Sequence, residues 1–182
     1  VLLVGAHFSM LDLAGTLIGN HIEVSITYKR QGNEVLNYVM ETGRSRTYKE
    51  CYVSRDLRTV VAALQAGDTV WYAPDQDFGP KHSIFVKFFN VPVAMVTATT
   101  RIAKSGNATV LGCSYFRRED HSGYDVYIHP PLPVPTDDPA ADAQAINDFI
   151  ESQVRLHPSQ YLWVHKRVKT QPDLERGALY KK

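Results

Sequence analysis

The first nineteen residues constrain the fold most, because they form an apolar run with only two clearly polar side chains, His7 and Asp12. The run opens with VLLVGA, which has the length and residue types of a buried β-strand. Ser9 then predicts a helix N-cap, and apolar side chains recur at helical spacing until Gly19 ends the helix. His7 should therefore leave the carboxyl end of a strand, where open α/β sheets place their ligands, with Asp12 in the first helical turn.

Three interpretations of this run differ in what His7 and Asp12 do. A transmembrane segment is excluded, because an Asp near its middle would cost roughly 2.5–3.5 kcal/mol even on insertion scales. A structural interpretation makes Ser9 and Asp12 a capping box and His7 a hydrogen-bonded interior histidine. A chemical interpretation makes His7 a general base whose tautomer the carboxylate fixes, so that a substrate hydroxyl attacks directly. The residues of the run are compatible with both of the last two.

Length and composition favour one domain, residues 1–182, with a sizeable core. The 44% hydrophobic and 21% charged content is ordinary for a globular protein, and a net charge of +1 argues against a nucleic-acid partner. Cys51 and Cys113 show no metal or redox spacing and fit a reducing compartment. The abrupt start inside an apolar strand suggests a fragment of a longer protein.

Strand and helix patterns alternate along the rest of the chain, which predicts a largely parallel sheet covered on both faces. The predicted fold class is therefore α/β, a three-layer αβα domain with a mixed sheet. Asn33 should cap a helix that Gly43 ends, with Val35, Leu36, Val39 and Met40 facing inward. The other expected elements are a strand at 21–29, a helix at 57–66, a strand at 68–74, a helix at 94–105, a strand pair flanking 117–123, and a helix from Thr136 to Pro158.

A second polar cluster follows the strand DTVWYAP, so Asp75 and Asp77 should also lie at the carboxyl edge of the sheet. A turn is one interpretation, because Asp, Gly and Pro all favour turns. A D-x-D metal site is another, and it would need further oxygen ligands nearby. A site for a polar substrate is the third interpretation. The carboxylates would accept hydrogen bonds from sugar hydroxyls or hold an arginine, and Lys81 would bind a phosphate.

Two further segments have both a structural and a functional interpretation. The aromatic-rich segment 83–89 is ordinary core by default, and an acyl-chain pocket or a membrane-touching lip in the functional case. Lys166, Arg167 and Lys169 form either a solvated face or a site for phosphates and anionic lipid headgroups.

Four motifs together resemble the bacterial lipid A biosynthesis acyltransferases, the late or secondary acyltransferases. They are GAHFSMLDLAG, GRSR, WYAPDQDFGPK and QYLWVHKRVK, which occur in the order and spacing of that family. The first contains HxxxxD, which the wider glycerolipid acyltransferases share, whereas the last two are more specific. The resemblance covers essentially the whole chain.

The resemblance implies roles for individual residues. His7 and Asp12 match the catalytic pair of the family, in which many members have Glu at the second position. Arg44 matches an active-site arginine, and Asp75 matches another functional position. The implied mechanism has His7 as the base, Asp12 on its far nitrogen, Arg44 near the oxyanion or a phosphate, and Asp75 orienting Arg44 or binding sugar.

The implied fold is similar to that of glycerol-3-phosphate acyltransferase. The implied reaction moves a fatty acyl chain from acyl-carrier protein to a hydroxyl of a lipid A precursor, without metal or cofactor, at the cytoplasmic face of the inner membrane. Two departures stand out: Lys87 replaces a common proline, and the N-terminal membrane-anchor region of the family is missing here. A metal-dependent hydrolase using His7, Asp75 and Asp77, or a catalytically silent lipid-binding domain, would be the alternatives.

Overall fold

The opening apolar run forms the strand around which the main sheet is built. Our computed structural model describes residues 1–54, 56–81 and 83–181. Strand β1 (Leu2–Val4) is almost completely buried and pairs in parallel with β4 (Val70–Tyr72) on one side and β7 (Val110–Arg117) on the other. Hydrophobic strands with neighbours on both sides are typical of parallel α/β sheets.

The main sheet has six strands in the order β3-β2-β4-β1-β7-β8. The β7–β8 pair is antiparallel and the other pairs are parallel, so the sheet is mixed, as predicted. A separate antiparallel hairpin is formed by β5 and β6. The remaining strands are β2 (Ser25–Tyr28), β3 (Cys51–Val53), β5 (Ser83–Phe88), β6 (Val91–Val96) and β8 (Tyr124–Pro131).

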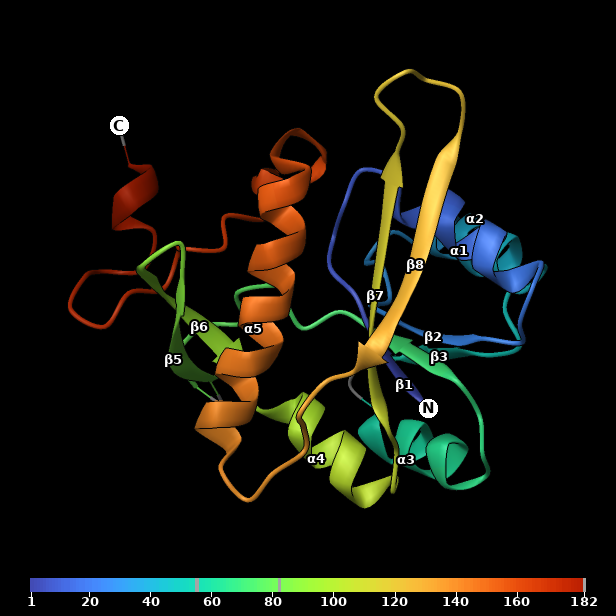
Figure 1. The fold of residues 1–182 in the computed structure, drawn as a ribbon, viewed down its shortest axis with the longest axis horizontal. Helices are drawn as coiled ribbons and strands as arrows, with labels where there is room; N and C mark the ends of the chain where they lie inside the picture. The colour runs from blue at the N-terminus through green and yellow to red at the C-terminus, as the bar shows by residue number, and fades with distance from the viewer. Residues whose placement is uncertain (55, 82, 182) are drawn as a thin grey trace.

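Five α-helices connect and flank these strands (Figure 1). In this view α1 and α2 lie together on one side of the β7–β8 pair, and α5 stands on the other side beside the β5–β6 hairpin. The helices are α1 (Leu11–Gly19), α2 (Glu34–Arg44), α3 (Leu57–Gln65), α4 (Ala98–Ser105) and α5 (Pro139–Leu156). Three short 3₁₀ turns follow at Pro158–Gln160, Trp163–His165 and Ala178–Tyr180. None of the helices in the described part of the chain is both long and apolar enough to span a bilayer.

Side-chain caps explain where several helices begin. The Asn33 side chain accepts the backbone N–H of Leu36 at 3.0 Å, as the sequence predicts. Asp138 accepts the N–H groups of Ala140 and Ala141 at the start of α5. Helix α1 differs, because Met10 occupies its N-cap position without a side-chain hydrogen bond.

The predicted Ser9 cap and capping box are therefore wrong, and the reason is a contact from far along the chain. The backbone N–H of Ser9 donates to the carbonyl of Gln160 at 2.8 Å, and Phe8 forms an isolated antiparallel bridge with Tyr161. The segment between β1 and α1 is thus held by the chain that follows α5. Local sequence patterns contain no information about such a long-range partner.

Three of the four side chains predicted to face inward on helix α2 are exposed, whereas the fourth, Met40, is half-buried and lines the cavity. Val35, Leu36 and Val39 are 74%, 49% and 59% exposed, whereas Asn37 is 3% exposed. The Asn37 side chain accepts the backbone N–H of Gln31 at 3.1 Å, which satisfies a buried polar group. The helix also continues through Gly43 to Arg44.

The expected helix at 94–105 is correct only in its second half, because its first residues belong to β6 and the helix starts at Ala98. Strand β2 begins at Ser25 rather than near residue 22, and Ile22 is exposed. Helices α3 and α5 and the β7–β8 pair form where the sequence predicts them.

Candidate active site

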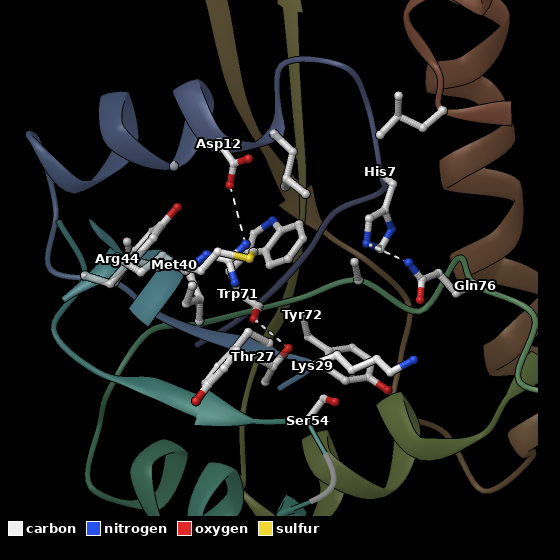
Figure 2. Close-up of a pocket in the computed structure, with 18 of the residues that line it drawn as sticks. His7, Asp12, Thr27, Lys29, Met40, Arg44, Ser54, Trp71, Tyr72 and Gln76 are labelled. Atoms are coloured by element: carbon white, nitrogen blue, oxygen red, sulfur yellow. Dashed lines mark hydrogen bonds and ion pairs between the residues drawn. The ribbon is translucent and has the colours of Figure 1, made fainter. Parts of the chain in front are cut away.

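A cavity of about 560 Å³ opens at the carboxyl ends of β1 and β4 (Figure 2). His7 follows β1 and Gln76 follows β4, so both enter the cavity from the edge of the sheet where ligands of α/β proteins bind. Arg44 enters from the end of α2, and Figure 2 shows it across the cavity from His7, with Trp71 and Met40 between them. The site predicted at this edge is thus a real concavity.

The imidazole of His7 is held by Asp75. The Asp75 carboxylate contacts His7 Nδ1 at 2.5 Å through Oδ1 and accepts the backbone N–H of His7 at 2.8 Å through Oδ2. These residues are adjacent because β1 and β4 are neighbouring parallel strands, which bring their carboxyl ends together. Two hydrogen bonds from one carboxylate fix both the backbone and the ring of His7.

Asp75 is buried, with 1% of its surface exposed, and its remaining acceptor capacity is also used. The hydroxyl of Tyr161 donates to Oδ2 at 3.1 Å. Burial alone would raise the pKa of Asp75, but the hydrogen bond from His7, the charge of His7 and the charge of buried Arg167 outweigh it and lower the pKa. The residue at the His7 ring is therefore an ionised carboxylate.

An ionised carboxylate at Nδ1 determines the tautomer of neutral His7. Because Asp75 can only accept, Nδ1 carries the proton, and Nε2 is left with its lone pair. Gln76 places its side-chain nitrogen 3.2 Å from that Nε2. This arrangement leaves Nε2 as a hydrogen-bond acceptor in a histidine that lines the cavity.

Asp12 lies in a different part of the site from the one predicted. Its carboxylate is 3.5 Å from the guanidinium of Arg44, and its side chain is 86% exposed. The prediction placed Asp12 on the far nitrogen of His7 and Asp75 beside Arg44, whereas the structure has the two acids exchanged. The physical reason is topology: Asp75 arrives from the strand next to β1, while Asp12 starts a helix that runs toward the Arg44 side.

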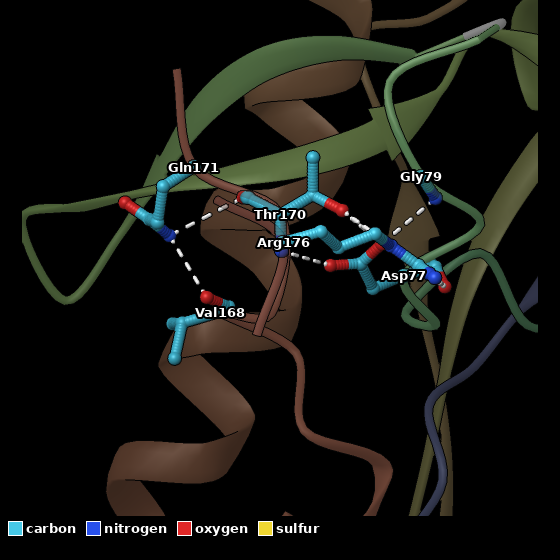
Figure 3. Close-up of polar contacts among 6 residues, drawn as sticks. All are labelled: Asp77, Gly79, Val168, Thr170, Gln171 and Arg176. Carbon is cyan, nitrogen blue, oxygen red and sulfur yellow. Dashed lines mark hydrogen bonds and ion pairs between the residues drawn. The ribbon is translucent and has the colours of Figure 1, made fainter. Parts of the chain in front are cut away.

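Asp77 holds the C-terminal segment against the loop after β4 (Figure 3). Its side chain is 1% exposed and accepts the N–H of Gly79 and both the N–H and hydroxyl of Thr170, at 2.6–2.8 Å. Arg176 adds an ion pair at 3.4 Å. The carboxylate oxygens of Asp77 are therefore used within this network, and Asp77 is not among the residues that line the cavity.

Lys81 is exposed and is likewise not among the cavity-lining residues. Among the described residues, no three His, Cys, Asp or Glu side chains converge in a way that could hold a metal ion. The catalytic and binding roles predicted for the individual residues stay predictions.

The segment 83–89 packs mostly away from the cavity. Phe88 is 2% exposed, and the guanidinium of Arg167 lies 4.1 Å from its ring centroid. Arg167 is itself 5% exposed, so the predicted solvated face at 166–169 is wrong at this position. None of the residues 83–89 is among those that line the cavity, and the acyl-pocket and membrane-lip interpretations of this segment stay predictions.

Sequence reasoning from single residues missed Gln76, Tyr161 and His165. His165 lies beside His7, with ring centroids 4.7 Å apart, and its Nδ1 is 3.4 Å from the side-chain nitrogen of Gln76. Burial, and then the charge of His7, lower the pKa of His165. All three belong to the PDQD and YLWVHKRVK motifs, so the motifs contained the signal without indicating the contacts.

Trp71 forms a wall of the cavity between its two ends. Its ring centroid lies 6.5 Å from that of His7. Gly5 makes this position possible, because a Cβ at residue 5 would lie 2.6 Å from the indole nitrogen. A side chain at residue 5 would therefore displace Trp71.

The fold and the cavity together define an α/β protein with a histidine–carboxylate site at the carboxyl edge of its sheet. The family model described as bacterial lipid A biosynthesis acyltransferase matches residues 1–170. The chain belongs to this family.

Characterised relatives agree with this assignment. The chain is 38% identical over 174 residues to the lipid A biosynthesis palmitoleoyltransferase of Escherichia coli K12, covering 94% of this chain and 56% of the relative. It is 36% identical to a lipid A biosynthesis acyltransferase of Haemophilus influenzae, covering 99% and 59%, and 34% identical to the E. coli lauroyltransferase, covering 95% and 57%. The chain thus spans a little over half the length of these relatives.

Proposed function

We propose that this chain is the catalytic part of an enzyme that transfers a fatty acyl group from an acyl-carrier-protein thioester to a hydroxyl of a lipid A precursor. Its family membership supports acyl transfer in lipid A biosynthesis. The observation that carries the proposed chemistry is the hydrogen bond between His7 Nδ1 and buried Asp75, which leaves Nε2 as a base in the cavity.

In the proposed mechanism, His7 Nε2 removes the proton of the acceptor hydroxyl while the hydroxyl oxygen attacks the thioester carbon. Asp75 holds the Nδ1 proton throughout and stabilises the imidazolium that forms. The tetrahedral intermediate then expels the thiolate, which takes the proton from Nε2. The products are an ester and the free thiol, and His7 returns to its starting state, so neither a metal ion nor a cofactor takes part.

At the other end of the cavity, Arg44 would bind an anionic group of the substrate, such as a phosphate of the precursor. Asp12 would orient the guanidinium from 3.5 Å, which gives this acid a role in substrate binding. Lys81 would contribute positive charge outside the cavity.

The wider setting follows from the family. We propose that acyl-carrier protein and the cytoplasmic surface of the inner membrane are partners, and that the fold is a three-layer arrangement similar to that of glycerol-3-phosphate acyltransferase. We also propose that residues 1–182 act as one domain of a longer protein.

The first experiment measures acyl transfer from a panel of acyl-carrier-protein thioesters to a lipid A precursor, in the presence of EDTA. It uses the chain in its full-length context. His7→Ala should reduce the rate by at least about a hundredfold, as is typical for loss of a general base. His21→Ala, at an exposed histidine, is the matched control and should retain full activity.

The experiment contradicts the proposal if no transfer occurs with any thioester, or if a folded His7→Ala variant keeps near-normal activity. Transfer that EDTA abolishes would indicate metal-dependent chemistry instead.

A further inference from the structure

Gln76 occupies the place that a substrate hydroxyl must take. Its side-chain nitrogen lies 3.2 Å from His7 Nε2, which is hydrogen-bonding distance from the proposed base. A hydroxyl that gives its proton to Nε2 needs a similar separation, about 2.6–3.2 Å. Substrate entry therefore requires the Gln76 amide to leave Nε2 and remain next to the reacting atoms.

The contacts of Gln76 show which end of its amide faces the reaction. Because Asp75 holds the proton on Nδ1, neutral His7 can only accept at Nε2, and its partner must be the amide NH₂ group. The same nitrogen lies 3.4 Å from His165 Nδ1, which can accept the second amide hydrogen. Burial lowers the pKa of His165, which favours this neutral, accepting form. His165 thus holds one amide hydrogen of Gln76 and leaves the other directed at the base, His7 Nε2.

A donor in this position suits the charge that develops during acyl transfer. Attack on the thioester carbon puts a negative charge on the former carbonyl oxygen, and donors already aimed at that charge lower the barrier. An amide N–H is neutral and does not give up its proton, so Gln76 can stabilise an oxyanion without competing with His7 for the hydroxyl proton. Arg44, the other donor considered from sequence, lies across the cavity beside Asp12 (Figure 2).

We propose that Gln76 is a further catalytic residue, whose side-chain N–H is held on His7 Nε2 in this structure and is donated to the oxyanion of the tetrahedral intermediate. His165 is a positioning residue that acts through Gln76. This inference rests on the proposed acyl transfer and names the group that stabilises its intermediate. No bond to Gln76 forms or breaks in the reaction.

The test is Gln76→Met, which keeps a side chain of similar length without the donors. It should lower kcat by about a hundredfold to a thousandfold, as removal of one oxyanion donor does in other acyl-transfer enzymes. KM for both substrates should change by less than about threefold, because the interaction is made only in the transition state. Gln65→Met is the matched control, since Gln65 bonds Ser105 on the surface far from the cavity, and it should change neither constant.

A pH profile distinguishes this role from simple positioning of His7. In the substrate complex, Gln76 has left Nε2, so Gln76→Met should lower the plateau of kcat at every pH without moving its acid limb. A structural role at Nε2 would instead move that limb. If Gln76→Met does not fold, Gln76→Leu tests the same point, because leucine also has no donor and adds no charge beside His7.

The inference is overturned if Gln76→Met keeps kcat within about threefold, or if its defect appears only in KM. Wild-type enzyme and His7→Ala are assayed alongside. If the wild type transfers no acyl group, the proposed function fails; if the wild type is active and Gln76→Met equally so, the role of Gln76 alone fails.

Discussion

At the His7 end of the cavity the carboxylate is buried, and at the Arg44 end it is open to water. Asp75 is 1% exposed and accepts hydrogen bonds from the His7 backbone, the His7 ring and Tyr161. Asp12 is 86% exposed and has a single ion-pair contact, at 3.5 Å. Both acids belong to family motifs, yet their surroundings make the interactions of Asp75 with its partners stronger than those of Asp12.

The difference follows from solvent and geometry. An ion pair in water gains little, because each charge is already solvated and the side chains lose freedom. A buried carboxylate interacts strongly with its donors, and removal of its charge leaves those donors without a partner. The His7–Asp75 pair is therefore fixed before substrate arrives, whereas the Arg44–Asp12 pair can adjust to the ligand.

The largest expected effect tests the His7–Asp75 pair. Asp75→Asn keeps the shape but replaces an acceptor by an amide, whose NH₂ group can donate to Nδ1 and move the imidazole proton to Nε2. The base is then lost, and kcat should fall on the order of a thousandfold or more. Steady-state kinetics of acyl transfer measure the effect, with circular dichroism to verify the fold. Activity within tenfold of wild type would show that Asp75 does not set the tautomer.

The second prediction tests whether the interactions of a buried carboxylate also stabilise the fold at Asp77. Asp77→Asn removes charge from a side chain that is 1% exposed and has three close donors, so it should destabilise the fold by about 2 kcal/mol. Urea unfolding measures the free energy of unfolding. The matched control is Asp173→Asn, at an exposed position, which should stay within about 0.5 kcal/mol. Equal free energies of unfolding for the two variants would show that burial of Asp77 does not make its interactions more stabilising.

The third prediction tests the Arg44–Asp12 pair. Asp12→Asn and Arg44→Lys should each lower kcat/KM on the order of tenfold, and the double variant should fall by less than the product of the two. The reason is that both changes disturb one unit, the oriented guanidinium. Asp12→Asn should not alter the free energy of unfolding measurably, because its carboxylate is 86% exposed. Fully multiplicative kinetic effects would mean that the two side chains act independently.

The smallest effect concerns pH. The pKa of His165 is lowered in the folded protein, so unfolded chains bind protons at His165 more readily as pH falls through about 6.5. The free energy of unfolding should therefore decrease between pH 7 and pH 5. His165→Gln should make that decrease smaller, as judged by urea unfolding at both pH values. An unchanged pH dependence in the variant would count against a neutral His165 beside His7.

Local patterns predict much of this fold and part of its site. Strand β1, helices α3 and α5 and the β7–β8 pair follow from periodicity and turn residues, and Asn33 caps its helix as expected. The orientation of α2 does not follow, because an apolar stripe does not reveal what it will face. The β5–β6 hairpin does not follow either, because the helical pattern predicted for 94–105 includes residues 94–96, which form the end of β6.

The site shows the same limit more clearly. The sequence places His7 and Asp75 at the carboxyl edge of the sheet, and the family resemblance assigns Asp12 and Arg44 to the same site, but neither specifies the pairs. The partner of His7 is 68 positions away rather than five, because strand order puts β4 beside β1. Pairing is a property of topology, which a short motif does not encode.

Trp71 gives the cavity a built-in optical reporter. Indole fluorescence depends on the polarity and mobility of its surroundings, and this indole lines the cavity between His7 and Arg44. The chain has two tryptophans, and the other, Trp163, is 51% exposed. Trp163→Phe would leave a protein whose emission changes when the cavity fills. Ligand occupancy could then be followed by light in real time, before any bond is made or broken.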